Sequence, residues 1–330
     1  MEYTISHLTM EENINYKVFA GTNSKYLGEK ICQQLKCTLG NLVRTNFSDG
    51  EFVVSFEESV RGKDVFLVQS TFPNTDNLME LLLMIDAAKR ASARQIIAVT
   101  PYFGWARQDR KDKPRVPIGA KVVADMLSCV GIDRLIAMDL HADQIQGFFN
   151  VPVDHLYASL LLLPYIRKQK YENLIIAAPD IGASKRAAKF SDKLQVPLVL
   201  CNKTRKKANI VDSIQIIGDV AGKNVILIDD MVDTAGTITM AADEMKKAGA
   251  LSVRAIASHC IMSGPASERV ENSALEEIVF TDSIPYHGTC KKVKQLSSAK
   301  LFAKAIEGIE QNRSLSSMVD FDLESNDKHI

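Results

Sequence analysis

Short apolar runs alternate with amphipathic segments along most of this sequence, from about residue 17 to about residue 310. The alternation is typical of βαβ units, in which each helix connects two parallel strands and covers one face of the sheet. The apolar runs predict strands at residues 17–20, 65–68, 96–99, 135–138, 174–177, 198–200, 225–228, 253–257 and 278–280. The amphipathic segments predict helices near residues 24–38, 77–93, 119–130, 183–193, 237–249 and 299–310. We therefore expect an α/β fold with mainly parallel sheets flanked by helices.

The length of 330 residues exceeds that of one ordinary domain and predicts two domains of about 150 residues each. The predicted strands fall into two similar sets, which meet near residues 151–160. We assign residues 17–155 to the first domain and residues 156–310 to the second. Residues 1–16 form an N-terminal extension, and residues 311–330 form a tail whose acidic, polar end favours disorder.

Composition and charge argue against several classes of protein. Lys and Arg together number 40, as do Asp and Glu, and this balance argues against nucleic acid or an anionic membrane as the main partner. The six cysteines show neither a Cys-x-x-Cys pair nor a zinc-type spacing, so we expect reduced thiols and no structural metal. No apolar run has the length of a membrane span, and residues 1–16 lack the basic and apolar regions of a signal peptide. We expect a cytoplasmic protein.

The stretch from Val225 to Thr237, which reads VILIDDMVDTAGT, carries the strongest sign of chemistry. Its apolar start predicts a strand buried on both faces, which places Asp229 and Asp230 at the carboxyl edge, where open α/β sheets bind ligands. The small residues that follow open a helix, and backbone N–H groups in such a turn bind phosphate. Because adjacent carboxylates suit sugar hydroxyls or a metal ion, a sugar phosphate fits the pattern. The alternative is a solvated strand end before an ordinary helix start.

Two other predicted strand ends carry polar side chains. Asp180 precedes a glycine turn and a helix in the segment APDIGASKR, and this spacing supports a metal ligand or ribose contact and a helix cap equally. His141 follows the strand at residues 135–138 in the segment MDLHA. A lone histidine is more often a packed or capping residue, but at the edge of a sheet a neutral imidazole could bind Mg²⁺-nucleotide or orient a phosphate.

A basic segment, WARQDRKDKPR at residues 105–115, contains the only tryptophan of the chain. Charge runs usually form solvated surface. Here Arg107 could pair bidentately with phosphate, while Gln108 and Asp109 could read the edge of a base. A nucleoside triphosphate is the simplest anion that needs all of these groups.

A second basic segment, KTRKK at residues 203–207, follows the predicted strand at residues 198–200. It begins a polar stretch that is long enough to be mobile. Such a loop could close over a reacting phosphate and bring Lys203 and Arg205 to it only when substrates are bound. The alternative is a disordered basic loop without a role.

The loop at residues 225–237 resembles the phosphoribosyl-pyrophosphate loop of the type I phosphoribosyltransferase fold. With FSDGE at residues 47–51, ESVRG at residues 58–62 and the four other segments, the sequence resembles the ribose-phosphate pyrophosphokinase family over about residues 17–316. The resemblance implies two tandem type I phosphoribosyltransferase-like domains, the first on the ATP side and the second on the ribose 5-phosphate side. Single-domain salvage transferases share the DDMVDTAGT loop alone.

The resemblance further implies that the pyrophosphoryl group of Mg-ATP is transferred to the 1-hydroxyl of ribose 5-phosphate, with release of AMP. It assigns roles to the following residues. The residues for ribose 5-phosphate are Asp229, Asp230, Asp233, Thr234, Ala235, Gly236 and Thr237; those for ATP are Arg107, Gln108 and Asp109, with Phe47, Asp49 and Glu51 from a neighbouring subunit. His141 and Asp180 would bind Mg²⁺, Lys203 and Arg205 would stabilise the transferring group, and Ser59, Arg61, Arg115, Ser314 and Ser316 would form an allosteric site.

The resemblance implies an assembly of dimers, usually a hexamer, that inorganic phosphate activates and ADP inhibits. The acidic end beyond Met318 departs from the aromatic and apolar end of the family and puts this regulation in question. Two other hypotheses stay open. A phosphoribosyltransferase would require a base-binding hood in place of the ATP segments. A non-catalytic regulatory homologue would carry changes in the catalytic segments, and we find none.

Overall fold

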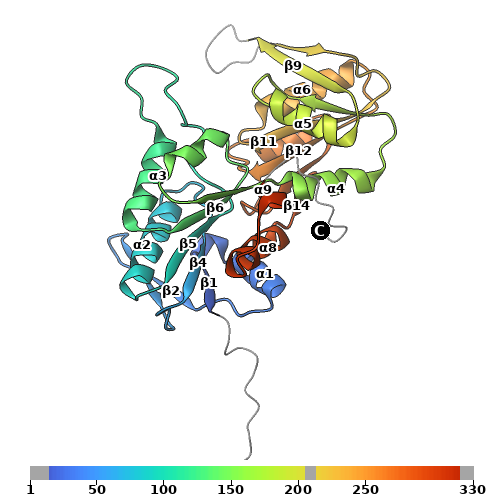
Figure 1. The fold of residues 1–330 in the computed structure, drawn as a ribbon. Coiled ribbons are helices and arrows are strands. Elements are labelled where there is room, and N and C mark those ends of the chain that lie inside the picture. The colour runs from blue at the N-terminus through green and yellow to red at the C-terminus, as the bar shows by residue number, and fades with distance from the viewer. Residues whose placement is uncertain (1–14, 205–212, 320–330) are drawn as a thin grey trace, which may run out of the picture. The chain divides into compact units, whose positions relative to one another are not determined.

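The computed structural model describes residues 15–204 and 213–319 (Figure 1). The chain divides into two compact units. Among the described residues, the first contains 15–155 and 302–315, and the second contains 156–204, 213–301 and 316–319. Each described unit is built around a mainly parallel sheet, as the alternating apolar runs predict.

The first unit has a five-stranded sheet in the order β1-β4-β5-β6-β7. Its strands are β1 (Tyr16–Ala20), β4 (Asp64–Val68), β5 (Gln95–Thr100), β6 (Arg134–Met138) and β7 (Val153–Leu156). The pairs β1–β4, β4–β5 and β5–β6 are parallel, with Val18 opposite Phe66 and Leu67 opposite Ala98. All five residues of β4 are buried, which explains why its sequence, DVFLV, is an almost unbroken apolar run.

Helices cover the sheet of the first unit. They are α1 (Lys25–Leu35), α2 (Asp76–Arg90) and α3 (Gly119–Val130), with short 3₁₀ helices η2 (Thr22–Ser24) and η3 (Asp143–Phe148). Leu81 of α2 and Leu127 of α3 are fully buried in the same cluster as Val65 and Leu67 of β4. The apolar stripe of each helix therefore seals one face of the sheet.

A separate antiparallel hairpin, absent from the sequence-based assignment, lies in the first unit. It consists of β2 (Leu42–Asn46) and β3 (Phe52–Phe56), with Asn46 opposite Phe52 as its last pair. Polar residues interrupt both strands, so neither shows the continuous apolar run by which the buried strands can be recognised. The hairpin loop is the FSDGE segment.

The second unit has a seven-stranded sheet in the order β10-β9-β8-β11-β12-β13-β14, in which β10 pairs antiparallel with β9. Its strands are β8 (Leu174–Ala178), β9 (Leu198–Thr204), β10 (Ser213–Ile217), β11 (Asn224–Val232), β12 (Ser252–Cys260), β13 (Leu275–Thr281) and β14 (Val293–Leu296). Its helices are α4 (Ser159–Gln169), α5 (Ser184–Leu194), α6 (Gly236–Lys247), α7 (Ala266–Asn272) and α9 (Ser316–Val319). Met245 of α6 and Val270 of α7 are buried with Val225 and Leu227 of β11.

Most of helix α8 (Ala299–Glu310) departs from the predicted domain organisation. The sequence assigns residues 156–310 to the second domain, but residues 302–315 cluster with the first unit. The physical reason is the packing of the end of α8 near the start of the first sheet, where Glu310 and Asp64 line one hollow. An amphipathic pattern shows that a helix has an apolar face but not which sheet covers it.

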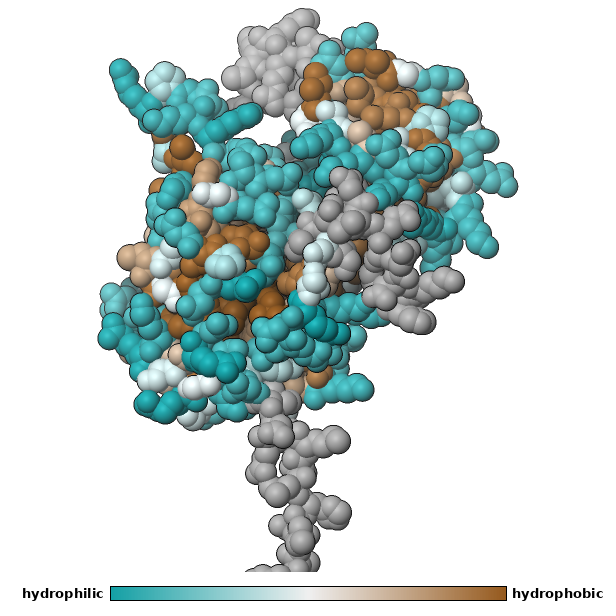
Figure 2. All heavy atoms as spheres, in the orientation of Figure 1, coloured by the Kyte–Doolittle hydropathy of each residue, from teal (hydrophilic) through white to brown (hydrophobic). Residues whose placement is uncertain are grey.

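The helices and the surface can be compared with what a membrane span or an apolar contact surface would need. In residues 15–204 and 213–319, none of the helices has both the length and the apolar character needed to cross a bilayer. The face drawn in Figure 2 is largely hydrophilic, with apolar patches over each unit. Exposed apolar side chains of the hairpin include Val43, Phe47 and Val53.

Candidate active site

The loop between β11 and α6 has the geometry of an anion-binding turn. Strand β11 ends at Val232, and α6 begins at Gly236 after a single left-handed residue, Ala235, with φ of 60°. The N-cap residue Ala235 makes no side-chain cap hydrogen bond at this helix start. The N–H groups of a first helical turn and the helix dipole together favour a phosphate at such a place.

Residues that follow β12 in the sequence form hydrogen bonds with the loop. The Ser263 hydroxyl donates to the Asp233 carboxylate, and the Ser263 N–H donates to the Asp233 carbonyl at 3.0 Å. Arg269 of α7 donates to the Thr234 carbonyl at 2.9 Å. These contacts fix the turn without using its helix-start N–H groups. The sequence analysis missed Ser263 and Arg269. The feature that could have pointed to them is the Ser-Gly-Pro turn after the buried strand β12.

Three carboxylates gather at the carboxyl edge of the second sheet. Asp229 and Asp230 lie on β11, and Asp180 follows the neighbouring parallel strand β8. Burial and then the adjacent Asp230 raise the pKa of Asp229 well above its ordinary value, and Asp180 contributes in the same direction. Burial and Asp180 also raise the pKa of the Cys201 thiol on β9 to about 12. The structure therefore brings these three acids close together, as their strand-end positions predict.

The turn before α5 holds Asp180 by a local hydrogen bond. Its carboxylate accepts from the Ala183 N–H at 3.2 Å. Ala183 is the N-cap residue of α5, and this helix start has no side-chain cap hydrogen bond, so the role of Asp180 as a helix cap is not supported.

In the first unit, the basic segment and the MDLHA segment meet at one sheet edge. The segment that contains Arg107, Gln108 and Asp109 follows β5, and His141 follows β6. Gln144 of η3 donates to the Asp109 carboxylate at 2.7 Å and so joins the two loops. Arg107, Gln108 and His141 are exposed, which leaves them accessible to a ligand.

Gln108 is positioned closely by its own loop and by α3. Its N–H donates to the Trp105 carbonyl at 2.9 Å, and its carbonyl accepts from the Ala120 N–H at 3.2 Å. A Cβ at Gly119 would lie 2.5 Å from the Gln108 side-chain oxygen, so a larger residue at the start of α3 would have to displace this side chain. The local structure therefore positions the segment that the sequence predicts to bind nucleotide.

The loop of the β2–β3 hairpin presents its polar and aromatic residues to solvent. The Phe47 N–H donates to the Glu51 carbonyl at 2.8 Å, and the Glu51 N–H donates to the Asp49 carboxylate at 3.0 Å. The Phe47 side chain is 50% exposed, although it is large and apolar. A turn with such ordered backbone bonds and an exposed ring fits a surface that meets a ligand or another chain.

The remaining predicted residues have different outcomes. Ser59 and Arg61 lie together, since the Arg61 N–H reaches the Ser59 hydroxyl at 3.5 Å, and Arg61 also donates to Ser92 at 3.1 Å. Arg115 is exposed in the basic segment with φ of 67°. Ser314 falls in the first unit and Ser316 in the second.

Lys203 and Arg205 are described only in part. The backbone of Lys203 lies in β9 opposite Ile214 of β10, while Arg205 lies outside the described residues. The predicted strand at residues 198–200 is therefore longer than its apolar run, because pairing with β10 extends it into the basic segment.

The described side chains do not form a complete metal-binding cluster. In the described ranges, no group of three or more His, Cys, Asp or Glu side chains is arranged to hold a metal ion. His141 belongs to the first unit and Asp180 to the second. The three neighbouring carboxylates still have the hard oxygen donors that Mg²⁺ prefers, and Mg²⁺ usually keeps several waters and is held by few protein ligands together with substrate phosphates.

Two hollows are lined by described residues, one in each unit. One of about 670 Å³ is lined in the first unit by Asp64, Arg94, Arg134 and the end of α8. Another of about 360 Å³ is lined in the second unit by Thr239, Asp243 and residues of α7. Open loops at a sheet edge enclose little volume until a ligand fills them, so the chemistry of the loops is the better guide to the site.

Comparisons with known proteins agree with this arrangement. A family model for the N-terminal domain of ribose phosphate pyrophosphokinase matches residues 16–131, and one for the phosphoribosyl synthetase-associated domain matches residues 207–320. The chain is 63% identical over 313 residues to a ribose-phosphate pyrophosphokinase of Porphyromonas gingivalis, covering 94% of this chain and 100% of that protein. It is 50% identical over 306 residues to one of Chlorobaculum tepidum, covering 92% and 95%.

A solved structure is also similar over most of its length. The crystal structure of phosphoribosylpyrophosphate synthetase from Mycobacterium smegmatis matches with a TM-score of 0.86 and 40% sequence identity. The match covers 90% of this chain and 99% of that chain. Both described units are therefore included in a likeness that extends from sequence to fold.

Proposed function

Because the chain belongs to the ribose-phosphate pyrophosphokinase family, we propose that it transfers the pyrophosphoryl group of ATP to the 1-hydroxyl of ribose 5-phosphate. The products are phosphoribosyl pyrophosphate and AMP. The chain is a transferase with the type I phosphoribosyltransferase-like α/β fold of its family. The acceptor loop between β11 and α6 is the observation that carries the proposal for this chain.

In the proposed site, the acceptor loop, residues 233–237, and the strand before it contact different parts of ribose 5-phosphate. The start of α6, with Thr234, Ala235, Gly236 and Thr237, is suited to the 5-phosphate. Asp229 and Asp230 lie on the preceding strand, at a reach suited to the ribose hydroxyls. Asp233, held by Ser263, would lie near the anomeric hydroxyl, where a carboxylate could accept its proton.

The donor nucleotide is assigned to the first unit. Arg107 supplies a planar cation for phosphate, and Gln108 and Asp109 supply hydrogen-bonding groups for the base. The hydrogen bond between Gln144 and Asp109 supports this assignment, because it holds the segment at the same sheet edge as His141. Phe47, Asp49 and Glu51 would complete the nucleotide site from the hairpin of a neighbouring subunit.

Mg²⁺ is proposed as the cofactor, with His141 and Asp180 among its ligands. When bound with ATP, it neutralises charge on the phosphate oxygens. The carboxylates Asp180, Asp229 and Asp230 would suit a cation, because they lie close together: burial, then Asp230 and Asp180, raise the pKa of Asp229. The protein groups orient the two substrates, and Lys203 and Arg205 place positive charge beside the transferring group.

Assembly and regulation extend the proposal. We propose a cytoplasmic homo-oligomer, of the hexamer-of-dimers type, activated by phosphate and inhibited by ADP. Exposed Val43, Phe47 and Val53 of the hairpin support a subunit contact, because such side chains gain from burial. The contact between Ser59 and Arg61 supports an anion site, to which Arg115, Ser314 and Ser316 are also assigned.

An assay of nucleotide products tests the proposed function. Purified protein incubated with ATP, Mg²⁺ and ribose 5-phosphate is expected to release AMP, and omission of ribose 5-phosphate is expected to abolish AMP release. Ribose 1-phosphate, whose anomeric oxygen is blocked, is the control acceptor and should give no product. Release of ADP, or of AMP without any sugar, would rule out pyrophosphoryl transfer.

A further inference from the structure

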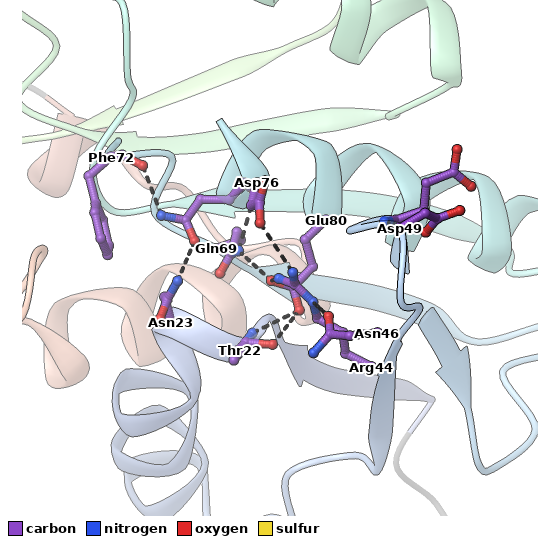
Figure 3. A network of polar contacts seen from close by, with 11 residues as sticks. Thr22, Asn23, Arg44, Asn46, Asp49, Gln69, Phe72, Asp76 and Glu80 are labelled. Carbon is purple, nitrogen blue, oxygen red and sulfur yellow. Dashed lines mark hydrogen bonds and ion pairs between the residues drawn. The ribbon is translucent and has the colours of Figure 1, made fainter. Parts of the chain in front are cut away.

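Arg44 lies at the base of the hairpin loop and uses all three guanidinium nitrogens (Figure 3). Its Nε donates to the Asn46 side chain at 3.0 Å. Its Nη2 donates to Asp76 at 3.2 Å, and its Nη1 lies 3.5 Å from the Glu80 carboxylate. The guanidinium carbon also lies 3.6 Å from the centre of the Phe52 ring. One side chain therefore touches both strands of the hairpin and two turns of α2.

The two hairpin residues that Arg44 contacts are the ones that close the loop. Asn46 and Phe52 form the last pair of the hairpin, and the FSDGE segment lies directly between them. A shift of either residue would carry Phe47, Asp49 and Glu51 with it, because the loop is bonded across its own base. Arg44 is therefore placed to set the orientation of this loop.

On the other side, Arg44 meets a carboxylate that is already fixed. The Glu80 side chain is fully buried, with 0% exposure. Its Oε1 accepts from the Thr22 N–H and hydroxyl at 3.0 and 2.7 Å, and its Oε2 accepts from Gln69 at 3.1 Å. Thr22 follows β1 and Gln69 follows β4, so the carboxylate is tied to the carboxyl edge of the first sheet.

From these contacts we infer that Arg44 is a positioning residue that clamps the FSDGE loop to α2 and to the carboxyl edge of the first sheet, and so sets the affinity for ATP. The inference rests on the proposed function, because it takes the loop as part of a nucleotide site. Arg44 itself does not touch the reacting atoms. Loss of the clamp is expected to weaken the binding of ATP. The binding of ribose 5-phosphate, which we assign to the second unit, should remain almost unchanged.

Lysine cannot replace arginine in this clamp. A planar guanidinium can stack on an aromatic ring while its edge donates in several fixed directions, whereas an ammonium is a point charge on a flexible stem. Arg44→Lys keeps the positive charge beside buried Glu80 and avoids leaving that carboxylate without a cation. The variant therefore removes the geometry of the clamp but not its charge, and it should fold.

The experiment compares Arg44→Lys with Arg134→Lys. Arg134 lies in the same unit and pairs with Asp154 at 2.7 Å, but the contacts of this pair do not include the hairpin. Equilibrium binding of a non-hydrolysable ATP analogue should weaken about tenfold or more in Arg44→Lys, as for loss of a well-oriented charged contact. Ribose 5-phosphate binding should change less than about twofold, and Arg134→Lys should resemble the wild type in both.

Hydrogen exchange of peptides covering residues 42–56 provides a second readout that does not depend on activity. It should become faster in Arg44→Lys than in the wild type or Arg134→Lys. Asp76→Asn removes a partner that is 48% exposed, and it should shift both readouts less, but in the same direction. If Arg44→Lys fails to fold, Asp76→Asn decides the test.

Unchanged ATP binding in these variants, or equal weakening of both substrates, would overturn the inference while leaving the proposed function intact. Unchanged exchange in the hairpin would overturn it as well. A wild-type protein that binds no ATP would instead overturn the proposed function and, with it, the nucleotide role of the clamp.

Discussion

Ala235 shows how one backbone conformation shapes the proposed phosphate loop. Its φ of 60° lies in the left-handed region, and its side chain is 4% exposed, so there is little room for a larger residue. The sequence TAGT gave the residue types of the loop but not this conformation, since alanine is uncommon with positive φ. Residue types predict a binding loop here, whereas its exact turn depends on tertiary contacts such as those of Ser263 and Arg269.

Ala235→Val should damage both stability and acceptor binding. A β-branched residue in the left-handed region adds strain of about 1–3 kcal/mol, and the buried position cannot relax easily. We expect a lower melting temperature and a ribose 5-phosphate KM raised about tenfold or more, with a smaller effect on the KM for ATP. Ala235→Gly is the matched control, because glycine accepts the same φ. Equal kinetics in the valine and wild-type proteins would show that the turn does not bind the acceptor.

At the scale of elements, strands that read as apolar runs were predictable, and strands broken by polar residues were not. The predicted strands within β4, β5, β8, β11 and β12 are confirmed, because each is covered on both faces and reads as an apolar run. The hairpin strands and the edge strands β7, β10 and β14 were missed, since their polar residues break any run. Helix α4 was missed as well, because its four consecutive leucines and internal Pro164 hide the helical period.

We expect Glu310, at the end of α8, to make the stability of the folded protein depend on pH. Burial and the neighbouring Asp64 raise the pKa of Glu310 from its ordinary value of 4.5 to about 7. The folded state thus keeps a proton that the unfolded state releases, so this group's favourable contribution is complete below about pH 4.5 and is lost as the pH rises through 7. Relative to Glu310→Gln, the wild type should lose melting temperature over this window.

Glu307→Gln is the control for that comparison. Glu307 lies one turn earlier on α8, is 50% exposed and pairs with Arg313 at 2.9 Å. Its variant should follow the wild-type pH profile. Parallel profiles for the wild type and Glu310→Gln between pH 4.5 and 7 would mean that Glu310 is not held protonated by its packing.

At the scale of the whole molecule, the chain contains two mainly parallel sheets, one of five strands and one of seven. The division at residue 155 places the segments proposed to bind nucleotide in one unit and the proposed acceptor loop in the other. Residues 302–315 return to the first unit, so the chain crosses between the units more than once. Sequence patterns predicted both sheets, but they could not predict this return, because it depends on which surface helix α8 covers.

A mixing experiment tests whether the nucleotide site is shared between subunits. Glu51→Ala and Lys203→Ala should each be nearly inactive alone, since one alters the hairpin loop and the other the basic segment. After dissociation, mixing in equal amounts and reassembly, roughly a quarter of sites should draw a normal residue from each parent under two-fold pairing. Activity should therefore partly recover. Proven subunit exchange without recovery would place both residues in the same site of one chain.

The fate of the two outer phosphates of ATP tests the central claim most directly. ATP labelled with ³²P at the β position, and separately at the γ position, is incubated with ribose 5-phosphate and Mg²⁺, and the sugar and nucleotide products are separated. Both labels should appear in the sugar product at equal rates, with unlabelled AMP released in the same amount. Transfer of the γ label alone, with ADP carrying the β label, would contradict pyrophosphoryl transfer.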